Sequence, residues 1–346
     1  MAFLLACIMG ASLVLYVLLG GADYGAGLWD LLSSGANKEG QKELIANAIQ
    51  PIWEANHVWL ILIIVLMFSG FPPAFGTIMT ALHVPILLML AGIVLRGSSF
   101  VFRAYSVLDS RTQRAYGYVF SMSSCFTPFF AGVILGAVSD DHVFVSQDVS
   151  LNGYVLNWMN PFTISAGVLT LALFAFLAAA YLTVEAPNEE LRRAFRRRAG
   201  AAAAAGGILA ILTFILSTRY ARGLAEGLVH NELARYSEFA AFITLALACF
   251  ALYKDSARVS RAMAAAHVGF IAVSWAAAQY PYLVRPGRTI FTSAASESVI
   301  RDIVYASIAG ALVLFPSLGL LFFVFKDKRR EKTAVLSVEA PLNIQY

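Results

Sequence analysis

Long apolar stretches separated by short polar intervals run through the whole chain. Nine of these stretches are each close to the roughly 20 residues that an α-helix needs to cross the hydrocarbon core of a bilayer. They lie at about 2–22, 52–70, 78–97, 117–138, 161–184, 201–217, 237–253, 263–280 and 303–325. Because they are uniformly apolar and lack the alternation of apolar and polar residues that marks barrel strands, we predict nine helices that span a membrane.

The composition supports a membrane protein. The 346 residues are 59% hydrophobic and 13% charged, with a mean hydropathy of +0.72, whereas an ordinary soluble domain contains about 25% charged residues. No basic residue precedes the apolar stretch at the amino terminus, which favours a retained first helix over a cleaved signal peptide. We therefore predict an all-α integral membrane protein that forms one membrane domain over residues 1–346, with a tail at 326–346 after the last span.

Lys and Arg residues gather on one side of the predicted membrane domain. If the tail is cytoplasmic, the loops on the same side are 23–51, 98–116, 185–200 and 254–262. Together with the tail, these loops contain 18 basic residues, against 6 on the opposite side. The positive-inside rule then places the carboxy terminus in the cytoplasm and the amino terminus outside. Basic segments of this kind lie near anionic lipid, so the net charge of +4 does not indicate a nucleic-acid partner.

Ionisable residues interrupt the start of the second predicted span. The segment Q-P-I-W-E-A-N-H-V-W-L at 50–60 places Glu54 and His57 one turn apart on one helix face. An ionisable residue at the centre of a membrane helix costs about 2.5 to 3.5 kcal/mol, so such residues usually pair inside a bundle or mark an ion path. Asp23 follows the first predicted helix and Arg96 closes the third, so both are expected at the same cytoplasmic depth as Glu54.

This group of side chains has two interpretations. In the first, Asp23 and Glu54 take up protons from the cytoplasm and His57 relays them, because the reference pKa of histidine is near neutrality. In the second, Arg96 and Glu54 form an ion pair that only holds two helices together. The spacing alone gives the two interpretations equal weight.

Neighbouring residues have expected roles in packing. Trp53 and Trp59 should pack between helices, and Asn56 should form a hydrogen bond there. His83, near the outer end of the third predicted helix, is expected to make a polar contact rather than to bind haem. The three cysteines stand alone in apolar segments, so they predict neither a disulfide nor a zinc site.

Several of these residues belong to motifs that resemble those of a known family, the haem-free subunit II of cytochrome bd-type quinol oxidases. The sequence G-A-D-Y-G-A-G at 21–27 is similar to that family's G-x-D-x-G-x-G pattern, and P-I-W-E-A-N-H-V-W-L at 51–60 resembles its P-x-W-(D/E)-x-N-x-V-W-L element. Other matches follow in the family's order: Phe71-Pro72, Arg96-Gly97 and Phe100-Val101-Phe102-Arg103. The residues assigned to the structural motif through this resemblance are Gly21, Gly25, Gly27 and Arg103.

The resemblance implies an architecture and a partner. The chain would form two four-helix bundles plus one peripheral helix, and it would pair with a larger subunit I that carries haem b and haem d, or a haem b variant. Subunit I oxidises quinol near the outer face and reduces dioxygen to water, so this chain would be inactive alone and would itself bind no haem or metal. A small accessory subunit and a structural quinone or lipid are further candidate partners. The location would be the cytoplasmic membrane of a bacterium or archaeon.

The resemblance also bears on the ionisable residues. In the family, the carboxylates that match Asp23 and Glu54 are associated with a proton route from the cytoplasm toward the haems, which favours proton conduction, with Arg96 as a charge partner. Glu54 stands where many members have Asp, and His57 where many have Gln or Glu, so the reach and charge of the route differ here. Two other classes of function remain open: a proton-coupled secondary transporter, and a structural or quinone-binding anchor.

Overall fold

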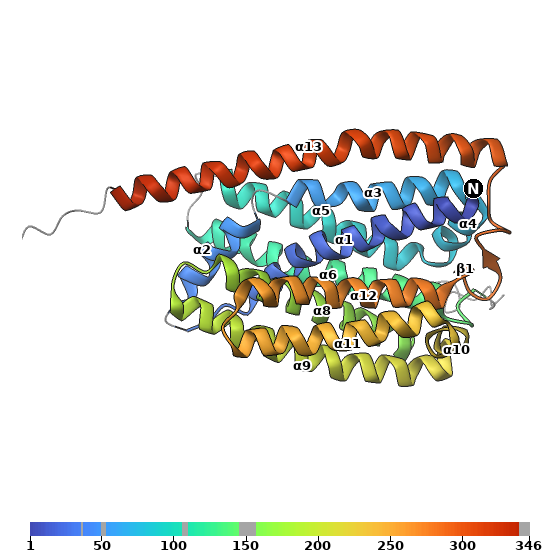
Figure 1. Ribbon diagram of the computed structural model, residues 1–346, viewed down its shortest axis with the longest axis horizontal. Helices are drawn as coiled ribbons and strands as arrows, with labels where there is room; N and C mark the ends of the chain where they lie inside the picture. Colours follow the sequence, from blue (N-terminus) through green and yellow to red (C-terminus); the bar gives the residue numbers. More distant parts are fainter. Residues whose placement is uncertain (36, 50–52, 106–109, 145–156, 339–346) are drawn as a thin grey trace, which may run out of the picture.

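The computed structural model describes residues 1–35, 37–49, 53–105, 110–144 and 157–338, which are almost entirely helical (Figure 1). In chain order, the elements are α1 (Ala2–Leu31), α2 (Lys38–Ile49), α3 (Trp53–Gly70), α4 (Pro72–Ala81), α5 (His83–Tyr105), α6 (Ser110–Ser139), α8 (Pro161–Glu185), α9 (Glu189–Tyr220), α10 (Arg222–His230), α11 (Glu232–Tyr253), α12 (Ala257–Gln279), the antiparallel strands β1 (Tyr282–Val284) and β2 (Arg288–Thr289), and α13 (Glu297–Val338). In this described part, eight helices are long and apolar enough to cross a membrane, and the bent pair of α3 and α4 would make a ninth span. The predicted all-α membrane fold is confirmed, whereas its division into two four-helix bundles stays a prediction.

Helix α1 continues to Leu31, past the predicted end at residue 22. The glycine motif lies within the helix and faces other helices at close range. A Cβ atom on Gly25 would overlap the backbone of Phe174 in α8, and one on Gly27 would overlap a serine of α6. Asp23 is therefore inside the helix, about 12 Å before its end, and not at the helix boundary where the sequence predicted it.

The second apolar stretch, predicted at 52–70, corresponds to α3, and a sharp bend follows it. Helix α3 ends at Gly70 and α4 begins at Pro72, with a bend of 116° between them. Proline lacks the N–H donor and disfavours helical backbone in the residue before it, so the sequence Pro72-Pro73 starts a new helix. Helix α4 in turn ends at Ala81 and α5 begins at His83, so the third predicted span at 78–97 covers parts of two helices.

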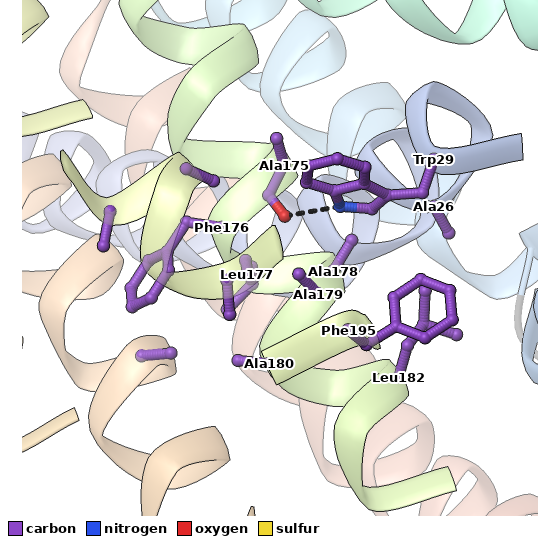
Figure 2. Close-up of a cluster of buried hydrophobic side chains, with 14 of the residues drawn as sticks. Ala26, Trp29, Ala175, Phe176, Leu177, Ala178, Ala179, Ala180, Leu182 and Phe195 are labelled. Atoms are coloured by element: carbon purple, nitrogen blue, oxygen red, sulfur yellow. Dashed lines mark hydrogen bonds between the residues drawn. The ribbon is translucent and has the colours of Figure 1, made fainter. Parts of the chain in front are cut away.

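An apolar core rich in small residues joins α8 to α1, α9 and α12 (Figure 2). Its buried alanines in α8 are Ala175, Ala178, Ala179 and Ala180. Trp29 of α1 points its indole at α8 and donates its N–H to the carbonyl of Ala175 at 2.8 Å (Figure 2). Small side chains let helices approach closely, and close packing matters in lipid because no hydrophobic effect draws helices together there.

The last helix, α13, lies along one edge of the molecule beside α3 (Figure 1). Its Leu314 and Leu318 pack on an aromatic cluster that contains Tyr16 of α1 and Trp59 of α3. Trp59 is buried, and its ring centre lies 6.0 Å from that of Phe315 in α13. Most of the large apolar side chains described in α13 are exposed, as expected of a helix at the edge of a membrane bundle.

Candidate functional site

A buried ion pair links α1 to α5. The Nη2 atom of Arg96 in α5 lies 2.6 Å from Oδ1 of Asp23 in α1, and only 2% and 6% of the two side chains are exposed. The Nε–H group of Arg96 donates a hydrogen bond to the hydroxyl of Ser124 in α6 at 3.0 Å. These groups therefore connect three helices, and removal of one member of the pair would leave an uncompensated buried charge.

Aromatic rings enclose the guanidinium group of Arg96. Its Cζ atom lies 4.8 Å from the ring centre of Tyr24 and 5.0 Å from that of Phe120. Cation–π contacts of this kind are worth about 2 kcal/mol when they are desolvated. The ring of His57 lies nearly parallel to that of Tyr24, with 6.5 Å between the centres and 14° between the planes. The ring of Tyr24 therefore contacts both the guanidinium of Arg96 and the imidazole of His57.

Two polar atoms around this ion pair are buried without a hydrogen-bond partner among the described residues. They are Oδ2 of Asp23 and Nδ1 of His57. Buried polar atoms are nearly always satisfied in folded proteins, commonly by ordered water. A carboxylate, a phenol and an imidazole thus surround one cation, and all three groups can exchange protons with water.

The structure places Asp23, Arg96 and His57 in one cluster. For three other predicted residues, Trp53, Glu54 and Asn56, the side chains are not among those that the structure describes. The predicted Arg96–Glu54 ion pair and the predicted role of Glu54 therefore stay predictions. In the described part of the chain, the carboxylate that pairs with Arg96 is that of Asp23.

A second acid–arginine pair lies two turns further along the same helices. The Nη1 atom of Arg103 in α5 is 3.2 Å from Oδ2 of Asp30 in α1, with 26% and 1% of the side chains exposed. The hydroxyl of Ser121 in α6 donates to the same oxygen at 2.6 Å. Sequence reasoning named Arg103 only as a motif residue and missed Asp30, although both acids and both arginines are spaced seven residues apart. We call Asp23–Arg96 the deep pair and Asp30–Arg103 the shallow pair.

Polar residues at the opposite end of the bundle have partners that tie loops together. The Nδ1 atom of His83 lies 2.9 Å from the carbonyl oxygen of Thr80, which is a polar contact of the expected kind. The buried Asp140 accepts hydrogen bonds from the N–H of His142 and from the side-chain amide of Asn160. Burial raises the pKa of Asp140, and these hydrogen bonds to the carboxylate offset part of that rise.

In the parts of the chain that the structure describes, no group of three or more His, Cys, Asp and Glu side chains is arranged to hold a metal ion. The oxygen and nitrogen atoms near the deep pair surround the guanidinium group of Arg96. This arrangement fits the handling of charge and protons inside the membrane.

Comparisons with known proteins agree on one family. A family model described as cytochrome bd terminal oxidase subunit II matches residues 1–325. The chain is 24% identical over 333 residues to the putative cytochrome bd menaquinol oxidase subunit II of Bacillus subtilis, which covers 91% of this chain and 93% of that protein. It is also 24% identical to cytochrome bd-I ubiquinol oxidase subunit 2 of Escherichia coli K12. That match extends over 185 residues and covers 53% of this chain and 48% of that protein.

One solved structure, that of the bd oxidase from Geobacillus thermodenitrificans, contains a chain with the same fold. The two chains superpose with a TM-score of 0.77 at 21% identity, and the match covers 94% of this chain and 98% of that chain.

Proposed function

Because this chain belongs to the family of cytochrome bd terminal oxidase subunit II, we propose that it pairs with a haem-bearing subunit I in a quinol:oxygen oxidoreductase of the bacterial cytoplasmic membrane. In this proposal the partner oxidises quinol and reduces dioxygen to water, and this chain supplies a proton route from the cytoplasm. The chain is inactive alone. The excess of Lys and Arg in the loops on one side supports an amino terminus outside and a carboxy terminus in the cytoplasm.

The haems of the proposed complex belong to subunit I. They are haem b with haem d, or a haem b variant, and they supply the electron transfer and the dioxygen chemistry when bound. A structural quinone or lipid and a small accessory subunit complete the proposed set of partners, and they rest on the family resemblance alone.

The observation that supports the proton route is that one carboxylate oxygen of Asp23 has no hydrogen-bond partner among the described residues. A pair that served only to hold helices together would commonly bind both carboxylate oxygens to the two arms of an arginine. Here Oδ1 of Asp23 meets Arg96, whereas Oδ2 is buried and has no partner among the described residues. That oxygen can accept a hydrogen bond from water, and water can deliver a proton to it.

The proposed route assigns a step to each ionisable side chain. Cytoplasmic water gives protons to Glu54 and Asp23, and His57 passes them on toward subunit I. Arg96 balances the negative charge of Asp23 between successive protons, because a bare carboxylate inside a membrane is costly.

Replacement of Glu54 by Gln in the complex with subunit I tests this proposal. Glu54→Gln keeps the shape of the side chain and removes its titratable proton, so the complex should assemble with full haem content. Oxygen consumption should fall roughly tenfold or more, as expected when a proton-transfer group is lost. Visible spectra measure the haem content, and an oxygen electrode measures turnover.

The exposed Glu297 in the first turn of α13 provides a matched control. Glu297→Gln should retain normal haem content and turnover. Normal turnover in Glu54→Gln would contradict the proton role, and loss of assembly would favour a role in holding helices together. A colourless chain that purifies from native membranes without a haem-bearing partner would favour a transporter.

A further inference from the structure

The deep pair and the shallow pair repeat one arrangement at two levels. In each pair the arginine stands 73 residues after the acid, and their separation of seven residues corresponds to about 10 Å along a helix. On α6, Ser124 contacts the deep pair and Ser121 contacts the shallow pair. These two serines are one turn apart, or about 5 Å. The two hydroxyl groups therefore lie between the levels of the deep pair and the shallow pair, with about 5 Å between them along α6.

The two arginines differ in how tightly they are held. Arg96 is 2% exposed and meets a carboxylate, a hydroxyl and two aromatic rings. Arg103 is 26% exposed, and its ion pair with Asp30 is longer, at 3.2 Å. Arg103 can therefore turn outward to water while Arg96 stays in place.

Asp30 is buried although its arginine reaches the surface. Only 1% of its side chain is exposed, and Oδ1 is buried without a hydrogen-bond partner among the described residues. Its other oxygen accepts hydrogen bonds from both Arg103 and Ser121. The carboxylate of Asp30 thus has one oxygen held by the neighbouring helices and one buried oxygen without a hydrogen-bond partner among the described residues.

Arg198 of α9 is a second cation near this end of α1, and its contacts are with groups other than Asp30. Arg198 of α9 donates to Gln41 of α2 at 2.7 Å and to the carbonyl of Leu32 at 3.4 Å, and its Cζ atom lies 5.4 Å from the ring centre of Trp29. In the described part of the chain, the charged group that contacts Asp30 is therefore the guanidinium of Arg103 on α5, and the contact from α6 is the neutral hydroxyl of Ser121.

We propose that Asp30 is the first proton acceptor of the route on the cytoplasmic side and that Arg103 controls its access to water. This inference rests on the proposed proton route through Asp23. When Arg103 turns outward, a hydronium ion gives a proton to the carboxylate of Asp30, which leaves a carboxylic acid and a water molecule. The proton then moves along water and the hydroxyls of Ser121 and Ser124 to Asp23. Asp30 becomes a carboxylate again, and Arg103 returns to it.

The test replaces Asp30 by Asn in the complex with subunit I and measures oxygen consumption across pH in H₂O and in D₂O. The complex should keep its haems, because the partly exposed Arg103 can find water when its partner becomes neutral. Turnover should fall roughly three- to tenfold at neutral pH. The loss should grow as the pH rises and hydronium becomes scarce, and the solvent isotope effect should increase. Ser121→Ala should lower turnover roughly twofold with the same increase in the isotope effect.

Two matched controls separate this role from a structural one. Ser123, also buried on α6, donates only to carbonyls of its own helix, so Ser123→Ala should leave turnover and isotope effect unchanged. Asp141→Asn removes a carboxylate that accepts from the N–H of Gly223 at the opposite end of the bundle, and it should also leave both unchanged. A change in these variants equal to that in Asp30→Asn would overturn the proposal.

Other outcomes distinguish this inference from the proposed function. If Asp30→Asn has the pH profile and isotope effect of the wild type while Glu54→Gln is slow, then Asp30 lies outside the route and the route itself stands. If Glu54→Gln also turns over normally, the proposed proton route fails first. If Asp30→Asn does not assemble, Ser121→Ala decides, because that variant keeps the shallow pair; an unchanged isotope effect there overturns the role of Asp30.

Discussion

Helix α1 is held by opposite means on its two sides. Toward α5, the contacts are two buried acid–arginine pairs, and α6 adds a serine hydroxyl to each pair as well as a close approach to Gly27. Toward α8, the contacts are small residues, including the close approach of Gly25 to a backbone carbonyl, with one hydrogen bond from Trp29. Lipid tails are as apolar as the side chains, so neither contact gains from a hydrophobic effect.

The difference indicates what each side is for. Close packing of small residues joins helices in lipid without any buried charge, and it is sufficient between α1 and α8. Buried ion pairs are often no more stabilising than apolar residues of the same volume. Cohesion alone therefore gives little reason for two such pairs between α1 and α5, and their presence agrees with the proton route that we propose.

Valine at Gly25 should have the largest effect, because it breaks the side of α1 that depends on close packing. Its Cβ would overlap the backbone of Phe174, which cannot turn away as a side chain can. We expect no haem-bearing complex in membranes, as measured by visible spectra. Gly10→Val adds its side chain in open space and should assemble normally. An assembled Gly25→Val complex would mean that the contact between α1 and α8 tolerates a shift of the backbone.

Leucine at Arg96 should have the next largest effect, on the charged side of α1. It leaves Asp23 buried without its counter-charge, which should cost about 3 to 5 kcal/mol of stability and lower the midpoint of thermal unfolding. The double variant Arg96→Leu with Asp23→Leu should regain most of this stability but not the oxygen consumption. Arg301→Leu, at a side chain that is 54% exposed, should change stability by only about 0.5 kcal/mol. Full turnover in the double variant would argue against proton transfer at the deep pair.

Alanine at Leu177 should have the smallest effect of the three and should sharpen the comparison. Leu177 is fully buried in the small-residue core, so the cavity should cost about 2 to 4 kcal/mol. Turnover per haem and its dependence on pH should stay unchanged, because the proposed proton route lies on the other side of α1. Ile211→Ala, at a position that is 62% exposed on α9, should leave the unfolding midpoint near that of the wild type. A shifted pH profile in Leu177→Ala would show that the two sides of α1 are coupled.

The spans could be predicted because apolar length is a local property of the chain. The end of the second span at residue 70 was predicted, but the separate helix α4 was not, because its last residues, 78–81, were assigned to the start of the third apolar stretch. The end of α1 could not be predicted from hydropathy either. Its last turns contain Asp23 and Asp30, which look like a loop until α5 and α6 supply their partners.

The candidate site was predicted in part. Asp23, Arg96 and His57 stood out because ionisable residues are costly in apolar segments, and all three lie in one cluster. Asp30 was missed because it lies eight residues beyond the predicted end of the first span, whereas Asp23 follows that end directly. Its seven-residue offset from Asp23, matched by the offset between Arg96 and Arg103, was present in the sequence. That offset has meaning only for two parallel helices within reach of each other's side chains, and this proximity is not a local property of the sequence.

The sequence by itself determined that this protein is a helical membrane protein, which side of it is basic, and which residues are too polar for a place in lipid without a partner. Each of these depends on the residue type and its near neighbours along the chain. Only the tertiary structure decided which acid pairs with Arg96 and that Tyr24 and Phe120 enclose the guanidinium group of Arg96. It also decided that the shallow pair, Asp30–Arg103, lies next to the deep pair. Those contacts depend on the rotation and register of three helices relative to one another, which are set by how their side chains pack and not by any single stretch of sequence.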